Sequence, residues 1–452
     1  MAAKVSQHHK KFEVNFATKT IVKASHPPQE SHTLTLSNLD LLSGRFPVTY
    51  FYFYHKPLLN HDFHSIIEAL KISLAETLNF FYPFAGRIVE NASTGEPEII
   101  CDNNGALILE AHANIPLKDF NFHNLDDSLK GKLISIHESF PFQAQVTSYA
   151  CGSVSITFTF DHALGDASSF GKFLLAWSEM SLKKPISSIP NHRRSLLNAR
   201  VPPRYDKSLD QDFVACTLEE IQNMPLPKTL VKRLYYVHAS RINELQSLAS
   251  ANGEKRTKIE AFSAYIWKVM VSVVEESNEK CKMGWLVDGR GRLMGNDSSL
   301  SNYIGNVLSV AFGEASLTEL KQWSISDIAK VAHEAIGKVA NEAHFLDLID
   351  WIECHRPGLM LSRVVLGRGG PAVVLSSCRR FPVVELDFGF GRPVLGTVCS
   401  TVEKIGVNYF NQRPAADEDG SWVVSAILWP ELAEALESKS IFQPMSASHL
   451  HV

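Results

Sequence analysis

The chain has 452 residues, of which 45% are apolar and 20% charged, values that are ordinary for a globular protein. Its 44 lysine and arginine residues stand against 48 acidic ones, a net charge of −4, which argues against a nucleic-acid-binding protein with its basic surface. The seven cysteines include no Cys-x-x-Cys pair, which favours free thiols in a reducing compartment over disulfides or a zinc site. We therefore expect a cytoplasmic protein with two or three domains, no metal and no membrane span.

Helix and strand patterns alternate in the first half of the chain. The predicted elements are strands over 34–40, 48–54 and 154–160, a helix that begins near Asp62 or Ser65 and ends before Pro83, a turn at 83–87, and a helix that carries Phe170 and Trp177 on one face. The strand at 154–160 is the clearest of these, because apolar residues alternate with serine and threonine along it.

A proline-rich segment over 181–212 shows no periodicity and is the best candidate for a linker. After it we predict helices over 259–273, 318–343 and 430–438, and strands near 283–287, 372–375, 383–388 and 421–429. The pattern therefore predicts an α/β protein with an N-terminal lobe over 1–180, a crossover over 181–212 and a C-terminal lobe over 213–452.

His162 and Asp166 follow the clear strand directly, in the run Phe160-Asp161-His162-Ala163-Leu164-Gly165-Asp166. The spacing alone is weak, because His123 and Asp127 repeat it in a polar segment with no strand before them. A neutral imidazole at the end of a strand, followed by small residues, is suited to act as a general base on an alcohol or amine. The alternative is a structural histidine whose partners are backbone groups.

Other catalytic schemes find less support in the sequence. Asp387-Phe388-Gly389 spells the magnesium-binding triplet of protein kinases, but the other kinase motifs are missing, and Gly389 and Gly391 instead indicate a turn. There is no Gly-x-Ser-x-Gly elbow of a serine hydrolase. The cluster Asp288, Arg290 and Arg292 is either a solvated loop or the source of an ion-pair partner for Asp166.

Together the motifs resemble those of the BAHD acyltransferases of plants. They are LSNLDLL at 36–42, YPFAGRI at 82–88, FDHALGD at 160–166, TKIEAFSAYIWK at 257–268, VDGRGRL at 287–293, YIGNV at 303–307 and LDFGFGRP at 386–393. The resemblance covers about residues 12 to 445. It implies two chloramphenicol-acetyltransferase-like lobes of mixed sheet and helices, joined by a long crossover loop, with acyl-CoA as co-substrate and no permanently bound cofactor.

The resemblance also implies roles for individual residues. His162 lies at the position of the general base, and Asp166 at that of an aspartate that pairs with an arginine, here Arg290 or Arg292. Asp387, Gly389 and Gly391 match a second signature that is mainly structural. Thr257 and Lys258 fall in a region that contacts the cofactor in relatives.

The chain departs from the family pattern at two places. Phe390 replaces the usual tryptophan of the second signature, which keeps an aromatic ring but loses the indole donor. Members that use shikimate or quinate carry Thr-Ser-Trp where this chain has Ser376, Ser377 and Cys378, and an upstream arginine to which Arg363 is a weak match. An apolar or aromatic alcohol is therefore favoured over a carboxylate-bearing polyol as acceptor.

The predicted function is transfer of an acetyl, benzoyl or hydroxycinnamoyl group from CoA to a hydroxyl or amine of a plant specialised metabolite, by a monomer that binds no nucleic acid. Two alternatives remain open at this point. One is a family member that binds or scaffolds without turnover, and the other is a thioester hydrolase that uses the same base.

Overall fold

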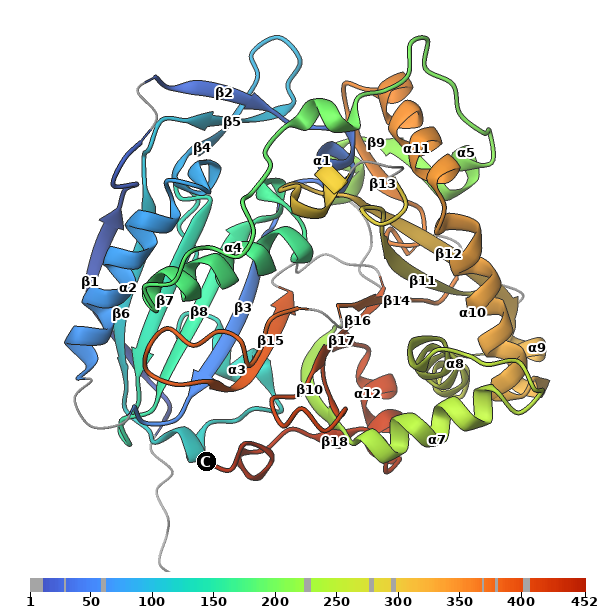
Figure 1. Cartoon of the computed structure of the whole chain (residues 1–452). Coiled ribbons are helices and arrows are strands. Elements are labelled where there is room, and N and C mark those ends of the chain that lie inside the picture. Colours follow the sequence, from blue (N-terminus) through green and yellow to red (C-terminus); the bar gives the residue numbers. More distant parts are fainter. Residues whose placement is uncertain are drawn as a thin grey trace, which may run out of the picture.

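A computed structural model describes residues 11–27, 30–57, 62–222, 229–275, 280–293, 298–367, 370–378, 381–400 and 407–452. These residues form two lobes side by side, each built on a mixed sheet with helices against it (Figure 1). The predicted α/β class with two lobes is confirmed.

The first large sheet holds six strands within the described residues. In spatial order they are β1 (Val14–Val22), β6 (Ala106–Ala113), β7 (Phe142–Ser148), β8 (Val154–Asp161), β3 (Pro47–Tyr54) and β15 (Pro393–Ser400). Only β6 and β7 are parallel among these neighbours. Helices α2 (Phe63–Thr77) and α4 (Ala167–Ser181) lie against one face, where Trp177 of α4 donates a hydrogen bond to the Leu70 carbonyl of α2 at 3.2 Å.

Strand β15 comes from the C-terminal half of the chain but pairs with β3 of the N-terminal half, from Pro393 opposite Tyr54 to Ser400 opposite Val48. The first lobe is therefore completed by a segment that follows most of the second. The exact limits of the lobes stay a prediction.

The second large sheet holds seven strands within the described residues. In spatial order they are β12 (Leu308–Ser316), β11 (Lys280–Asp288), β14 (Ala372–Ser377), β16 (Asn408–Pro414), β17 (Trp422–Leu428), β10 (Val231–Val237) and β18 (Gln443–Pro444). Helices α8 (Lys258–Val271), α10 (Ile325–Val339) and α12 (Pro430–Glu437) cover one face of it. Pro430 is at the start of α12, where a missing N–H removes no helical hydrogen bond.

Smaller elements complete the two lobes. Two small sheets are formed by β2 (His32–Thr35), β5 (Pro97–Cys101) and β4 (Arg87–Glu90), and by β13 (Leu359–Ser362) and β9 (Phe213–Cys216). The remaining helices are α1 (Asn38–Ser43), α3 (Leu125–Leu129), α5 (Leu209–Asp212), α6 (Leu218–Gln222), α7 (Ala239–Ala249), α9 (Leu317–Gln322) and α11 (Glu342–His355). The short 3₁₀ segments among the described residues are η1 (Tyr82–Ala85), η2 (Leu117–Asp119), η3 (His162–Leu164), η4 (Arg194–Leu197), η5 (Ser298–Asn302) and η6 (Ala447–Leu450).

Most predicted elements are confirmed, but the strand over 34–40 is wrong. Strand β2 ends at Thr35, and helix α1 occupies 38–43. Ser37 and Asp40 form a reciprocal capping box, in which the Ser37 side chain accepts from the Asp40 N–H and the Asp40 carboxylate accepts from the Ser37 N–H. This local capping overrides the apolar pattern that had suggested a strand.

Two further predictions are corrected. The segment over 383–388 is not a strand, because its carbonyl oxygens accept hydrogen bonds from side chains, among them Ser178 and Tyr54, in place of a strand partner. The single helix over 318–343 is divided among α9, α10 and α11. Ser324 caps the start of α10 and Asn341 that of α11, since short polar side chains favour such starts.

The crossover over 181–212 is held by ion pairs to the second lobe. Arg200 contacts Asp347 and Asp350 of α11, each at 2.5 Å. Arg194, also in this segment, is buried and pairs with Asp40 of the first lobe. Between the short elements η4 and α5 the prolines favour irregular backbone, while the arginines fix the path of the segment.

Candidate active site

His162 follows the last residue of β8 and begins the short 3₁₀ turn η3. The turn forms here because the Asp161 carboxylate accepts a hydrogen bond from the Ala163 N–H at 2.9 Å. The His162 N–H donates to the Phe46 carbonyl at 2.9 Å, and its ring stacks on Phe46 with centres 4.6 Å apart. Backbone and ring contacts therefore fix the imidazole at the C-terminal end of β8.

The imidazole has an asymmetric environment. Its Nδ1 is buried and has no hydrogen-bond partner among the described residues. Burial lowers the pKa of His162 below its usual 6.5, and the nearby carboxylates of Asp166, Asp161 and Asp40 oppose this only in part. The ring is therefore neutral at pH 7, which is the form that a general base needs.

The Asp166 carboxylate does not bind the imidazole but binds groups of the second lobe. Its Oδ2 accepts a hydrogen bond from Arg290 Nη1 at 2.7 Å and another from the Val307 N–H at 3.0 Å, while Oδ1 caps α4 by accepting from the Ser169 N–H at 3.0 Å. Asp166 is 1% exposed and Arg290 5%. Arg292 is exposed, so Arg290 is the partner that the sequence left undecided.

Electrostatics keep this pair charged. Burial alone would raise the pKa of Asp166, but Arg290 and the two backbone N–H groups hold it below its ordinary value. Arg290 Nη2 also donates to Ser169 Oγ at 2.9 Å and to the Gly305 carbonyl at 2.8 Å. The pair therefore ties the start of α4, directly after His162, to the segment 305–307 of the second lobe.

A second buried ion pair lies beside the first and was missed in the sequence. Arg194 Nε contacts Asp40 Oδ2 at 2.9 Å, and Asp40 Oδ1 accepts from the backbone and side-chain N–H groups of Asn306 at 2.6 and 2.9 Å. The Asn306 amide also donates to the His162 carbonyl at 3.0 Å. The signals were present as Ser37-x-x-Asp40 and YIGNV, but nothing in them revealed that they meet across the lobes.

The second signature segment packs against the first lobe, where the Leu386 carbonyl accepts from the Tyr54 hydroxyl and the Asp387 carbonyl from Ser178 of α4. Asp387 Oδ1 accepts from the N–H groups of Gly389 at 2.8 Å and Gly391 at 3.1 Å, and both glycines have positive φ, +96° and +116°. Phe390 packs edge-on against Tyr54 with ring centres 4.9 Å apart. The structure therefore gives Asp387, Gly389 and Gly391 a shared task, the shape of a turn that packs on the first lobe.

Thr257 and Lys258 begin helix α8. Thr257 caps it, because its side chain accepts from the Glu260 N–H at 3.3 Å and its own N–H donates to Glu260 Oε2 at 2.7 Å. This explains Thr257 without a ligand, and contact of either residue with CoA stays a prediction. Arg363, the weak match to a substrate arginine, instead binds the end of the crossover, where its Nη2 donates to the Asp210 carbonyl at 3.3 Å and its backbone N–H to the Asp212 carbonyl at 2.8 Å.

Within the described ranges, no group of three His, Cys, Asp or Glu side chains could hold a metal ion. Over the same residues, none of the helices combines the length and apolar character that crossing a bilayer requires.

The site is thus a strand-end histidine beside an aspartate–arginine pair between two lobes. A family model described as "Transferase family" matches residues 12–441. The chain therefore belongs to the BAHD family of acyl-CoA-dependent acyltransferases.

Curated relatives agree with this assignment, and solved structures share the fold. The chain is 28% identical to rosmarinate synthase of Plectranthus scutellarioides over 94% of this chain and 98% of the relative. It is 29% identical to anthranilate N-benzoyltransferase protein 1 of Dianthus caryophyllus over 81% and 83%. The fold matches that of vinorine synthase with a TM-score of 0.72 at 21% identity, over 96% of this chain and 99% of the other. It also matches F. graminearum TRI101 complexed with coenzyme A and T-2 mycotoxin, with a TM-score of 0.73 at 14% identity, over 91% and 99%.

Proposed function

We propose that this protein transfers an acyl group from acyl-CoA to a hydroxyl or amine of a small aromatic acceptor, by direct attack in a ternary complex. His162 removes the proton from the acceptor as its oxygen or nitrogen attacks the thioester carbonyl. The tetrahedral intermediate then collapses, the C–S bond breaks, and CoA leaves as a thiolate that takes up the proton from the imidazolium. No covalent acyl-enzyme is part of this scheme.

The state of the His162 ring carries this proposal. The ring is neutral because burial lowers its pKa, and its buried Nδ1 leaves Nε2 as the nitrogen that would receive the proton. Asp166 does not bind this ring, so the arrangement differs from a serine-hydrolase triad, in which a carboxylate holds Nδ1. A positioned base of this kind contributes about 10²- to 10⁴-fold to the rate.

The remaining site residues do not exchange protons with the substrates in this scheme. Asp166 and Arg290 are positioning residues, since they fix the turn that carries His162 against the second lobe. Asp387, Gly389 and Gly391 hold a structural turn. Thr257 and Lys258 would lie on the CoA side, where a lysine could meet a phosphate as a point charge.

The substrate class is the least constrained part of the proposal. The names of relatives include a hydroxycinnamoyltransferase of Narcissus pseudonarcissus, an anthranilate N-benzoyltransferase and an agmatine hydroxycinnamoyltransferase, which supports an aromatic acyl donor and leaves both O- and N-transfer open. Acetyl-CoA is the third candidate donor. We propose a monomer that acts in the cytoplasm.

The test is thiol release from acetyl-, benzoyl- and hydroxycinnamoyl-CoA, each with pools of phenolic, benzylic and aliphatic alcohols and amines. We expect release from at least one donor that depends on an acceptor and yields the corresponding ester or amide by mass spectrometry. Release without any acceptor would indicate a hydrolase. Folded protein that releases no thiol with any pair would support the scaffold alternative and overturn the proposal.

A further inference from the structure

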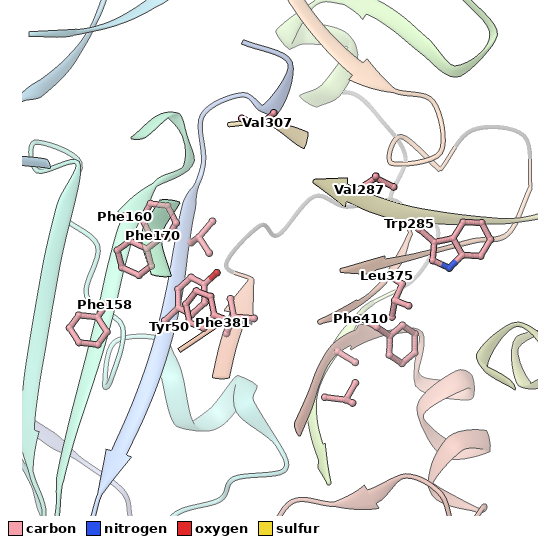
Figure 2. Close-up of a cluster of buried hydrophobic side chains, with 14 of the residues drawn as sticks. Tyr50, Phe158, Phe160, Phe170, Trp285, Val287, Val307, Leu375, Phe381 and Phe410 are labelled. Carbon is pink, nitrogen blue, oxygen red and sulfur yellow. The ribbon is translucent and has the colours of Figure 1, made fainter. Parts of the chain in front are cut away.

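A third buried arginine lies between the lobes, on β16. In Figure 2, Phe410 of this strand lies in the cluster of side chains on the helix-covered side of the second sheet. Because side chains alternate along a strand, Arg413 lies on the opposite face, which meets the first lobe. Its guanidinium carbon is 5.1 Å from the ring centre of Phe381 and 5.9 Å from that of Tyr50, and these two rings stack 4.6 Å apart (Figure 2).

Arg413 differs from the other buried arginines in having no acid partner. It is 1% exposed, yet no aspartate or glutamate of the described residues forms an ion pair with it, whereas Arg290 has Asp166 and Arg194 has Asp40. Nη1 donates to the Gln412 carbonyl at 2.8 Å, the guanidinium also forms a hydrogen bond with the Tyr50 hydroxyl, and Nε has no partner in the part of the chain that the structure describes. A buried cation without a counter-charge is costly, so an anion that reaches it binds favourably.

The surroundings of Arg413 are suited to an oxyanion. The Tyr50 hydroxyl is directed toward the second sheet, and burial raises the pKa of Tyr50 to about 12, so it stays a neutral donor (Figure 2). The thiol of Cys378 also lies near Arg413.

Arg413 is connected to the proposed base through two ring contacts. Tyr50 lies 6.1 Å from Phe160, centre to centre, and Phe160 lies 6.5 Å from the His162 ring. Arg413 therefore contacts the same aromatic cluster as the proposed base.

We propose that Arg413 and the Tyr50 hydroxyl form a carboxylate subsite at the lobe interface, which binds the carboxylate of a substrate. The carboxylate belongs either to an aromatic hydroxy or amino acid used as acceptor, or to a dicarboxylic acyl donor such as malonyl-CoA. A guanidinium binds a carboxylate through two parallel N–H donors. The inference rests on the proposed acyl transfer and revises its acceptor, since Arg413 supplies a cation that Arg363 does not.

The test compares each acid with its methyl ester. The acceptors are 3-hydroxybenzoate, 3-aminobenzoate and their methyl esters, and the donors acetyl-CoA and malonyl-CoA, with wild type, Arg413→Met and the surface control Arg241→Met, which removes an exposed ion pair on α7. We expect Arg413→Met to lower kcat/KM about 10- to 100-fold for the carboxylate substrate and to leave its neutral counterpart within about twofold. Loss confined to the acids identifies an acceptor subsite, and loss confined to malonyl-CoA a donor subsite.

Equal losses for acid and ester, or none for either, would overturn the inference while acyl transfer itself continued. Absence of acceptor-dependent thiol release by wild type would instead be a failure of the proposed function. If Arg413→Met does not fold, the test is made on the wild type. Its melting temperature is measured with 3-hydroxybenzoate, malonate and methyl 3-hydroxybenzoate at equal concentrations. Stabilisation by an anion but not by the ester supports the subsite, and equal shifts or none with the anions contradict it.

Discussion

The two signature segments each contain an aspartate, but the two carboxylates have different partners. Asp166 reaches across the lobe interface to a buried arginine, and the turn before it carries the imidazole. Asp387 accepts hydrogen bonds from N–H groups of its own turn. The first segment therefore links the proposed base to the lobe interface, whereas the second stabilises the conformation of its own turn. The presence of each signature in the sequence does not distinguish these two roles, but the hydrogen-bond partners of the two aspartates do.

The largest expected effect comes from removing the imidazole in the first segment. His162→Ala should lower kcat by about 10²- to 10⁴-fold, because proton removal from the acceptor is lost. The matched control is His123→Ala, since His123 and Asp127 have the same spacing but His123 contacts Glu437, at 3.1 Å. Steady-state thiol release and circular dichroism check both. Equal activity in the two folded variants would remove His162 from the mechanism.

The buried pair of the first segment should dominate stability. Asp166→Asn removes the buried partner of Arg290 and leaves it only Asp288, at 3.2 Å, as a counter-charge, so we expect the free energy of unfolding to fall by about 3 kcal/mol. Urea denaturation measures this, with Arg292→Met as the exposed-arginine control. The double variant Asp166→Asn with Arg290→Met should recover part of the loss. A loss under about 1 kcal/mol in the single variant would show that the pair is not an important link.

Removing the aspartate of the second segment should lower stability less than removing Asp166. Asp387→Ala removes two hydrogen bonds to backbone N–H groups, at an expected cost of about 1–3 kcal/mol in unfolding free energy. Asp387→Asn, which keeps the Oδ1 acceptor, is the conservative control and should be nearly neutral. If Asp387→Asn lost activity while remaining folded, the segment would have a chemical role and the contrast between the segments would fail.

The pH profile tests the electrostatics of the first segment. Since burial lowers the pKa of His162 below its usual 6.5, the midpoint of the acid limb of kcat/KM should lie below pH 6.5, with the base in its active form at neutral pH. The Asp166 carboxylate raises this pKa, so folded Asp166→Asn should shift the acid limb to still lower pH. A shift to higher pH would have the wrong sign for this arrangement.

The smallest effect is expected from restoring the family tryptophan. Phe390→Trp enlarges a ring that already packs against Tyr54, so we expect unfolding free energy to change by no more than about 1 kcal/mol and kcat/KM by less than about threefold. Denaturation and thiol release measure the two quantities. A large gain in activity would mean that the indole donor has a role in this turn.

Sequence reasoning found the residues whose signals are local. The alternation over 154–160 marked β8, and the motif after it marked His162 and Asp166. It could not choose Arg290 over Arg292, because both lie in one loop and only the tertiary arrangement buries one of them. Asp40 was assigned to a strand because its apolar neighbours masked the capping box, so its pairing with Arg194, more than 150 positions away, was missed. Arg413 gave no signal, since its unusual property is the lack of a partner in the folded chain.

The central claim is that the acyl group passes directly from CoA to the acceptor, with a neutral imidazole as base. It is tested most directly by measuring thiol release and the intact mass of the protein in the absence of acceptor. Wild-type protein is mixed with its acyl-CoA, and the acceptor is added later. The account predicts no release beyond the uncatalysed rate and no added acyl mass on the protein, followed by the full rate when the acceptor arrives. A stoichiometric burst with an acylated protein, or steady release without acceptor, would contradict it.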